Sequence, residues 1–154
     1  MNAESPIRIG QVMTPEVRTI GRTATVREAV TIMREAGVSS LVVERRDEAD
    51  EFGLLVVTDI AREVIGKDLS ADRVNVCEVM TKPVLSLPAE MDIRYAVRML
   101  TRFQLARALV LDNERAPVGI VTLRDMVLRH KAGEDVSGAQ VARGVDGQST
   151  AASV

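Results

Sequence analysis

Aromatic side chains are scarce in this chain, which has two Phe, one Tyr and no Trp among its 154 residues. We therefore do not expect stacking on aromatic rings to be the main contact with any bound base. The 20 basic and 22 acidic residues nearly cancel, leaving a net charge of −2, so no polyanion-binding character extends over the whole molecule. We expect no nucleic acid and no membrane surface as a partner.

Cysteine and histidine each occur once, as Cys77 and His130. A single cysteine forms no internal disulfide, and its neighbours Val76 and Val79 favour buried packing over nucleophilic chemistry. His130 has no nearby set of metal ligands, so we expect a surface position near a helix end and no metal site. No apolar run reaches the roughly 18 to 20 residues that span a bilayer, and no signal peptide is recognisable. We expect a soluble, cytoplasmic protein.

What the chain does contain is a duplication. Three blocks of the first half return in the second: Val12-Met13-Thr14 as Val79-Met80-Thr81, Arg27-x-Ala29-Val30 as Arg94-x-Ala96-Val97, and Gly53-Leu54-Leu55 as Gly119-Ile120-Val121. The spacing is 67 residues for the first two blocks and 66 for the third. Two copies of a unit of roughly 60 residues predict a pseudo-twofold pair, because a solenoid usually needs three or more units. A ligand site is expected where the two copies meet.

Each copy contains one helix with clear start and stop signals. In the first copy, Thr25 and Glu28 form a predicted capping box, apolar residues follow at helical spacing, and Gly37 ends the helix. The second copy repeats the apolar stripe from Ile93 onward, with Asp92 as the predicted N-cap.

Short β-rich runs surround these helices. We predict strands at 17–20, 38–44 and 54–57 in the first copy and at 84–87, 107–111 and 118–121 in the second. The last two strands of each copy form a hairpin, followed by a further helix at 59–65 or 125–131. The acidic residues 47–51 fall in the first hairpin loop, where we expect them to be solvated. Each copy is thus a β-α-β-β-α unit.

The two repeats, at residues 6–68 and 73–132, are expected to form one compact domain, since 46% of the side chains are hydrophobic. Residues 133–154 are rich in Gly, Ser, Ala and Gln and lack an apolar period, so we expect a flexible tail. A short docking helix at 136–145 is the alternative.

The chain resembles a tandem pair of cystathionine-β-synthase (CBS) domains, often called a Bateman module, over residues 6–132. The resemblance rests on Val12-Met13-Thr14-Pro15, Val79-Met80-Thr81-Lys82-Pro83, the two helix stripes and Gly119-Ile120-Val121-Thr122-Leu123-Arg124-Asp125. It implies an α/β (α+β) fold in which the two repeats pack through their sheets with pseudo-twofold symmetry. It also implies a regulatory role, because such modules commonly bind AMP, ADP, ATP or S-adenosylmethionine between the repeats. The regulated target would then be a separate protein.

The family pattern Gly-h-x-Thr/Ser-x-x-Asp ends a strand and opens a helix, and the resemblance implies that its Asp binds ribose hydroxyls. An ionised carboxylate suits this role because it only accepts hydrogen bonds, and charge-assisted bonds are the stronger kind. The second copy keeps the pattern whole. The predicted second site comprises Ile7, Val12, Val38, Ser39, Ser40, Ile120, Thr122, Arg124 and Asp125.

The first copy departs from the pattern, because Val56 replaces the hydroxyl residue and Thr58 stands directly before Asp59. The first site is therefore expected to be weaker or to bind another ligand. The resemblance implies that Arg107 matters for either cleft, because many relatives have a basic residue aimed at phosphate there. Arg107 and Arg124 are the best candidate phosphate ligands, since the planar fork of arginine suits phosphate. The predicted first site comprises Leu54, Thr58, Asp59, Val74, Val79, Leu105, Ala106 and Arg107.

Simpler explanations stay open for these residues. Thr122 and Asp125 would also cap a helix, and Arg107 would also form a salt bridge with an acidic neighbour. A second function is a ligand-free structural module that forms a homodimer through Ile60, Val64, Met126 and Val127. An enzyme with a catalytic cofactor is not expected, because the chain has no nucleophile with a base, no Walker loop and no dinucleotide fingerprint.

Overall fold

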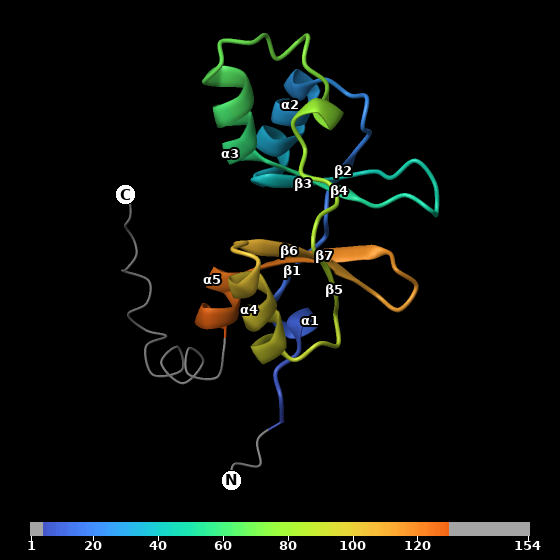
Figure 1. Ribbon diagram of the computed structural model, residues 1–154, viewed down its shortest axis with the longest axis vertical. Coiled ribbons are helices and arrows are strands. Elements are labelled where there is room, and N and C mark those ends of the chain that lie inside the picture. The colour runs from blue at the N-terminus through green and yellow to red at the C-terminus, as the bar shows by residue number, and fades with distance from the viewer. Residues whose placement is uncertain (1–4, 130–154) are drawn as a thin grey trace.

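The computed structural model describes residues 5–129. Figure 1 shows two halves stacked with their sheets facing each other and their helices on the two outer sides. In the first half α2 (Val26–Ala36) and α3 (Val57–Ile60) lie outside the sheet, and in the second α1 (Ile9–Val12), α4 (Ile93–Arg102) and α5 (Leu123–Leu128) do. The predicted mixed α/β class is thereby confirmed. His130, the expected flexible tail 133–154 and the alternative helix at 136–145 lie outside the described residues.

Each half contributes one sheet. The first has the order β2-β3-β4, with bounds Thr19–Ile20, Ser40–Val43 and Gly53–Val56. The second has the order β1-β7-β6-β5, with bounds Thr14–Pro15, Pro117–Thr122, Arg107–Leu111 and Ser86–Pro88. Both predicted hairpins are confirmed, because β3 pairs antiparallel with β4 and β6 pairs antiparallel with β7.

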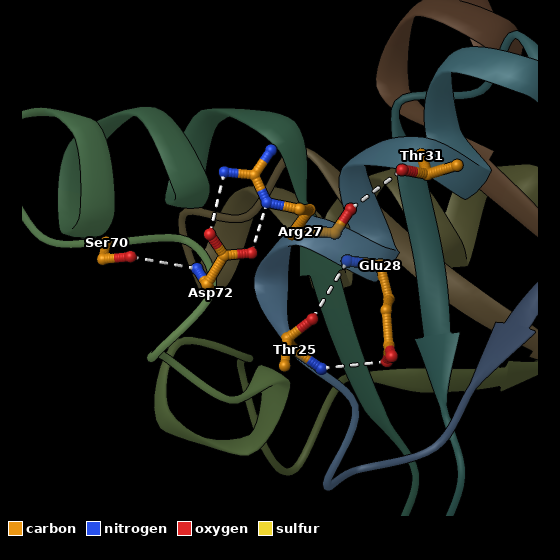
Figure 2. A network of polar contacts seen from close by, with 6 residues as sticks. All are labelled: Thr25, Arg27, Glu28, Thr31, Ser70 and Asp72. Atoms are coloured by element: carbon orange, nitrogen blue, oxygen red, sulfur yellow. Dashed lines mark hydrogen bonds and ion pairs between the residues drawn. The ribbon is translucent and has the colours of Figure 1, made fainter.

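The predicted helix signals are confirmed at α2 and α4. Thr25 Oγ1 accepts from the Glu28 amide at 3.2 Å, and the Glu28 carboxylate accepts from the Thr25 amide at 3.1 Å (Figure 2). Gly37 ends α2 with φ of 69°, a left-handed conformation that glycine adopts without steric cost. Asp92 caps α4 by accepting from the Arg94 amide at 2.8 Å.

The lead-in segments, residues 7–15 and 74–81, are exchanged between the halves. Ile9 and Val12 are buried in the core of the second half, and the Ile9 amide donates to the Met91 carbonyl at 2.9 Å. Val74 and Val76 are buried in the core of the first half. Each half therefore needs a segment that precedes the other one in the sequence, and neither repeat packs as a contiguous unit.

A methionine of each lead-in segment lies against a glycine of the opposite strand pair. At Gly119 an added Cβ would lie 2.9 Å from Met13 Cγ and from the Thr14 carbonyl oxygen. At Gly53 it would lie 2.7 Å from Met80 Sδ. The duplicated Met and Gly thus pack against each other in the same way in both halves.

Several helix bounds differ from the prediction. The helix expected at 59–65 begins at Val57, and α3 continues as a π-helix over Ala61–Ile65. The helix expected to begin at residue 125 begins at Leu123 instead, because Thr122 is its N-cap. The sequence did not predict α1, β1 or the 3-10 helix Val76–Glu78, which are too short to show a period.

Three of the four residues predicted to form a dimer interface are buried within the chain, so the prediction was wrong for these three. Ile60, Val64 and Met126 are no more than 3% exposed and pack in the cores of their own halves. Val127 is exposed, as are Val57, Ile65 and Leu128 on the same pair of helical segments. The error came from choosing apolar residues by type, because the periodicity of a short helix does not fix which face the rest of the chain covers.

Candidate ligand-binding cleft

A hollow of about 240 Å³ opens between the two halves, at the ends where β3 begins and β7 finishes. Polar, charged and aliphatic side chains from four segments line it: Thr14, Pro15, Glu16, Val17, Arg18, Gly37, Val38, Ser39, Ser40, Val42, Arg107, Ile120 and Thr122. The structure thus brings together Val38, Ser39, Ser40, Ile120 and Thr122 of the predicted second site.

Thr122 and Asp125 form the capping box that the simpler explanation predicted. Thr122 Oγ1 accepts from the Asp125 amide at 3.0 Å, and Asp125 Oδ2 accepts from the Thr122 amide at 3.2 Å. Within residues 5–129, Asp125 Oδ1 makes no hydrogen bond. A helix cap therefore leaves one carboxylate oxygen available to another donor. Neither Asp125 nor the exposed Arg124 is among the residues that line the hollow.

Arg107 lies in the hollow with Thr122, although the sequence placed it with the first site. The two residues are directly opposite each other on β6 and β7. They share a face with Leu109 and Ile120, which pack between the sheets. Arg107 is half-buried, and its guanidinium forms no ion pair or hydrogen bond with any of residues 5–129, so the described part of the chain contains no salt bridge to explain it.

A backbone group on the opposite wall is also available. The Val38 carbonyl and the Ser39 amide make no hydrogen bond within the described residues, whereas the Val38 amide donates to the Met33 carbonyl and the Ser39 carbonyl accepts from the Val57 amide. The two groups belong to one trans peptide unit and point in opposite directions, so only one of them can face the cleft. This wall therefore offers one free backbone group for a hydrogen bond to the edge of a base.

Sequence reasoning missed the segment from Thr14 to Arg18, which forms a wall of the hollow. It chose Ile7 and Val12 instead, but these pack in the core of the second half. The duplicated Thr that directly follows each Met was the available signal. Arg18 is exposed and adds a second cation to the wall, while Glu16 adds one negative charge.

The predicted first site remains a prediction, and its residues differ in environment. Val74 and Val79 pack in the core of the first half, and Leu54 packs between the sheets. Thr58 and Ala106 are exposed, and the Ala106 carbonyl accepts from the Leu123 amide.

Asp59 forms an ion pair within its own helical turn. Its Oδ1 pairs with Arg62, and Val56, the N-cap residue of α3, has no side-chain oxygen to cap the helix. The cross-strand pair that corresponds to Arg107 and Thr122 is Ser40 and Val56. At these two positions the first half thus has no counterpart of the Arg107 guanidinium and none of the Thr122 hydroxyl.

A larger hollow of about 710 Å³ runs along β5. Leu105 of the predicted first site lines it with Phe103, Val84, Leu87 and Leu111, and Glu51, Asp112 and Arg115 lie at its rim. It does not contain Asp59. The acidic loop residue Asp50 is held elsewhere: Lys82 donates to it at 2.8 Å, which lowers the pKa of its carboxyl.

Two features are absent from residues 5–129, a metal-ligand group and a membrane-spanning helix. These residues contain no group of three or more His, Cys, Asp or Glu side chains placed to hold a metal ion. None of their helices has the length and apolar character needed to cross a bilayer.

Comparison with known proteins identifies the family. The CBS domain family profile matches residues 9–66 and 76–130, so the chain belongs to the CBS domain family as a tandem pair. The hexameric CBS-CP12 protein from bloom-forming cyanobacteria has the same fold, with a TM-score of 0.77, 26% identity, and coverage of 93% of this chain and 87% of that one. The resemblance seen in the sequence is confirmed.

Two other relatives show how CBS pairs occur. Inosine-5'-monophosphate dehydrogenase of Methanocaldococcus jannaschii is 28% identical over 122 residues, which are 79% of this chain and 23% of that protein. The chain spans 23% to 61% of the length of three curated relatives that it matches. The CBS domain protein PAE2072 of Pyrobaculum aerophilum, in a complex with AMP, has a TM-score of 0.70 at 19% identity, covering 86% of this chain and 99% of that one. This last similarity concerns the fold alone.

Proposed function

We propose that the chain is a regulatory ligand-sensing module that binds an adenine nucleotide (AMP, ADP or ATP) or a related adenosyl ligand, and that it signals to a separate protein. The observation that carries the proposal is the pair formed by Arg107 and Thr122. It places an unpaired cation and a hydroxyl on the inner face of the sheet, beside a free backbone group of the other half.

Each part of such a ligand has a complement in the cleft. One free backbone group of the peptide between Val38 and Ser39 suits a hydrogen bond to the adenine edge, and Ile120 and Val42 offer aliphatic cover for its faces. Thr122 and the free oxygen of Asp125 suit ribose hydroxyls, and Arg107 suits a phosphate. AMP is bound by one protein of this fold, PAE2072.

The size of the hollow limits what it encloses. Its volume of about 240 Å³ is below the range of roughly 300 to 1,000 Å³ typical of small-molecule pockets. We infer that the base and ribose are enclosed while any second or third phosphate extends toward solvent. The ligand would contact both halves, and its binding would therefore change the equilibrium between arrangements of the two halves, which a partner protein can detect.

We propose that the ligand occupies a single cleft in each chain. In the first half Ser40 and Val56 replace the cation and the hydroxyl, and Arg62 already pairs with Asp59. Ribose there would have to displace the Arg62 guanidinium from Asp59.

Titration calorimetry of AMP, ADP, ATP and S-adenosylmethionine into nucleotide-free protein tests the proposal. We expect saturable binding of at least one of them that is lost in Asp125→Ala and kept in Asp59→Ala, the corresponding residue of the first half. Circular dichroism establishes that both variants fold. If the wild type binds none of the four ligands, the proposal is wrong.

A dimerisation module that needs no ligand is the second candidate. It is favoured by the exposed apolar residues Val57, Ile65, Val127 and Leu128 on the helical segments after the two hairpins. Light scattering distinguishes the two functions, because a dimer whose mass and stability no nucleotide changes supports this second candidate.

A further inference from the structure

The outer face of α4 carries a row of arginines. Arg94, Arg98 and Arg102 follow one another every four residues, which puts them on one side of the helix about 6 Å apart along its axis. All three are exposed, and α4 contains no Asp or Glu. Like charges one turn apart disfavour a helix, so this arrangement is unfavourable unless an anion compensates it.

The first half shows that the fold does not require this charge. The positions of α2 that correspond to Arg98 and Arg102 hold Thr31 and Glu35. The hydroxyl of Thr31 donates to a carbonyl of its own helix, as Figure 2 shows. The two helices share their buried stripe, so the difference on the outer face has no origin in packing.

Pairing within the molecule does not neutralise the row. The first arginine of each helix has a carboxylate partner: Arg27 pairs with Asp72 (Figure 2), and Arg94 pairs with Asp92 at 2.9 Å. Arg98 and Arg102, by contrast, form no ion pair with any of residues 5–129.

Tyr95 lies among these arginines. The guanidinium carbons of Arg94 and Arg98 are 5.8 and 5.4 Å from the centroid of its ring, and the residue is 51% exposed. Tyr and Arg are the side chains most enriched, together with Trp, at the energetic centres of protein interfaces. The ring offers apolar cover to the stems of acidic side chains while the arginines pair with the carboxylates.

An apolar hollow begins where α4 ends. Phe103 follows Arg102 directly and is 54% exposed, and it lines the 710 Å³ hollow along β5 with Leu105. A segment that lies along α4 can therefore place an apolar side chain at Phe103 without leaving the arginine row.

We propose that the outer face of α4 binds an acidic segment of a separate protein. Its carboxylates pair with Arg98 and Arg102, beside the Arg94 and Asp92 pair, and an apolar residue next to them packs on Phe103. The ten residues of α4 span about 15 Å, which accommodates only a few carboxylates. The net charge of −2 confines attraction for anions to such a local face, and this favours a short acidic segment over a long polyanion.

The test uses the full chain and a labelled synthetic peptide with four Glu residues one helical turn apart and one Phe. We expect saturable binding by fluorescence anisotropy, weakened at least tenfold in Arg98→Glu/Arg102→Glu. The matched control is Arg34→Glu/Arg73→Glu, which changes the net charge equally at exposed positions of the first half and should leave the affinity within twofold. Circular dichroism and thermal melts check the folding of both variants.

Three results would overturn the proposal. The wild type does not bind the peptide, both double variants lose affinity equally, or oligothymidylate or phosphatidylserine vesicles bind the α4 face more tightly than the peptide. Because adenine nucleotides are absent from this titration, its outcome is independent of the proposed nucleotide site. Phe103→Ser, which removes the apolar anchor, should weaken the binding of the peptide. It should leave the dependence of that binding on salt concentration unchanged.

Discussion

Arg107 and Thr122 face each other across β6 and β7, where the sheet of the second half meets the first half of the chain. Substitution of Arg107 by Ala should lower the affinity for AMP about 10- to 100-fold, the equivalent of one lost hydrogen bond to a charged group. The affinity for adenosine, which has no phosphate, should stay within a few-fold of wild type. Calorimetry with both ligands measures the difference, and an equal loss for both would contradict the phosphate role of Arg107.

The capping boxes of Thr25 and Thr122 provide a matched pair for separating stability from binding. Thr25→Ala and Thr122→Ala should each lower the free energy of unfolding by about 1 kcal/mol, because each removes one N-cap hydrogen bond. Only Thr122→Ala should weaken nucleotide binding. Urea unfolding and calorimetry on the same two proteins test this, and a loss of affinity in Thr25→Ala would show that general destabilisation explains both effects.

The difference between the two halves predicts how many nucleotides each chain binds. Wild-type protein should bind a single nucleotide per chain. Restoring the second-half hydroxyl and freeing Asp59 in the first half, as Val56→Thr/Arg62→Ala, should raise the calorimetric stoichiometry to two. Two equivalent sites in the wild type would show that the Asp59 and Arg62 pair does not prevent binding.

Gly119 and Gly53 should differ in their tolerance of a methyl group. Gly119→Ala should destabilise the protein by about 1 to 3 kcal/mol, since the new Cβ would lie 2.9 Å from a backbone oxygen, that of Thr14. Gly53→Ala should cost less, because its nearest neighbour is the flexible end of Met80 and the nearest backbone oxygen is 3.3 Å away. Thermal melts give the order, and Gly21→Ala, with open space around it, is the control.

Asp92 should contribute to the loss of stability in acid. Hydrogen bonds from Arg94 lower the pKa of this buried carboxyl below that of an unfolded Asp, which is about 3.9. Its stabilising effect is therefore complete above that pH and is lost as the pH falls through the lower, folded value. Asp92→Asn keeps a good N-cap residue but should show a smaller decline in unfolding free energy below about pH 4.

The control for this measurement is Asp68→Asn, an exposed carboxyl that forms no ion pair within the described residues. It should leave the acid profile unchanged. The same profile in Asp92→Asn and wild type would mean that another carboxyl, such as Asp50 beside Lys82, dominates the acid response.

Local signals in the sequence were sufficient for the secondary structure around the site. The caps at Thr25, Asp92 and Thr122 act within four residues, and the hairpin strands are short β-rich runs bounded by polar loops, so both can be recognised without the rest of the chain. The duplication was equally visible, because identities at constant spacing need no knowledge of packing. That Val38 to Ser40 share a cleft with Thr122 was implied by the family resemblance and not by these local signals, and the structure places the four residues along one hollow.

The sequence by itself determined the two repeats, their helices and hairpins, and the intact Thr122 and Asp125 pattern. Only the tertiary structure decided that residues 7–15 and 74–81 exchange halves, that Thr14 to Arg18 line the cleft, and that Arg107 faces Thr122. Thr14 pairs with Ile120, more than a hundred residues away in the chain. Such a contact depends on the closure of long loops and on the burial of whole surfaces, and these are properties of the folded chain that no local pattern contains.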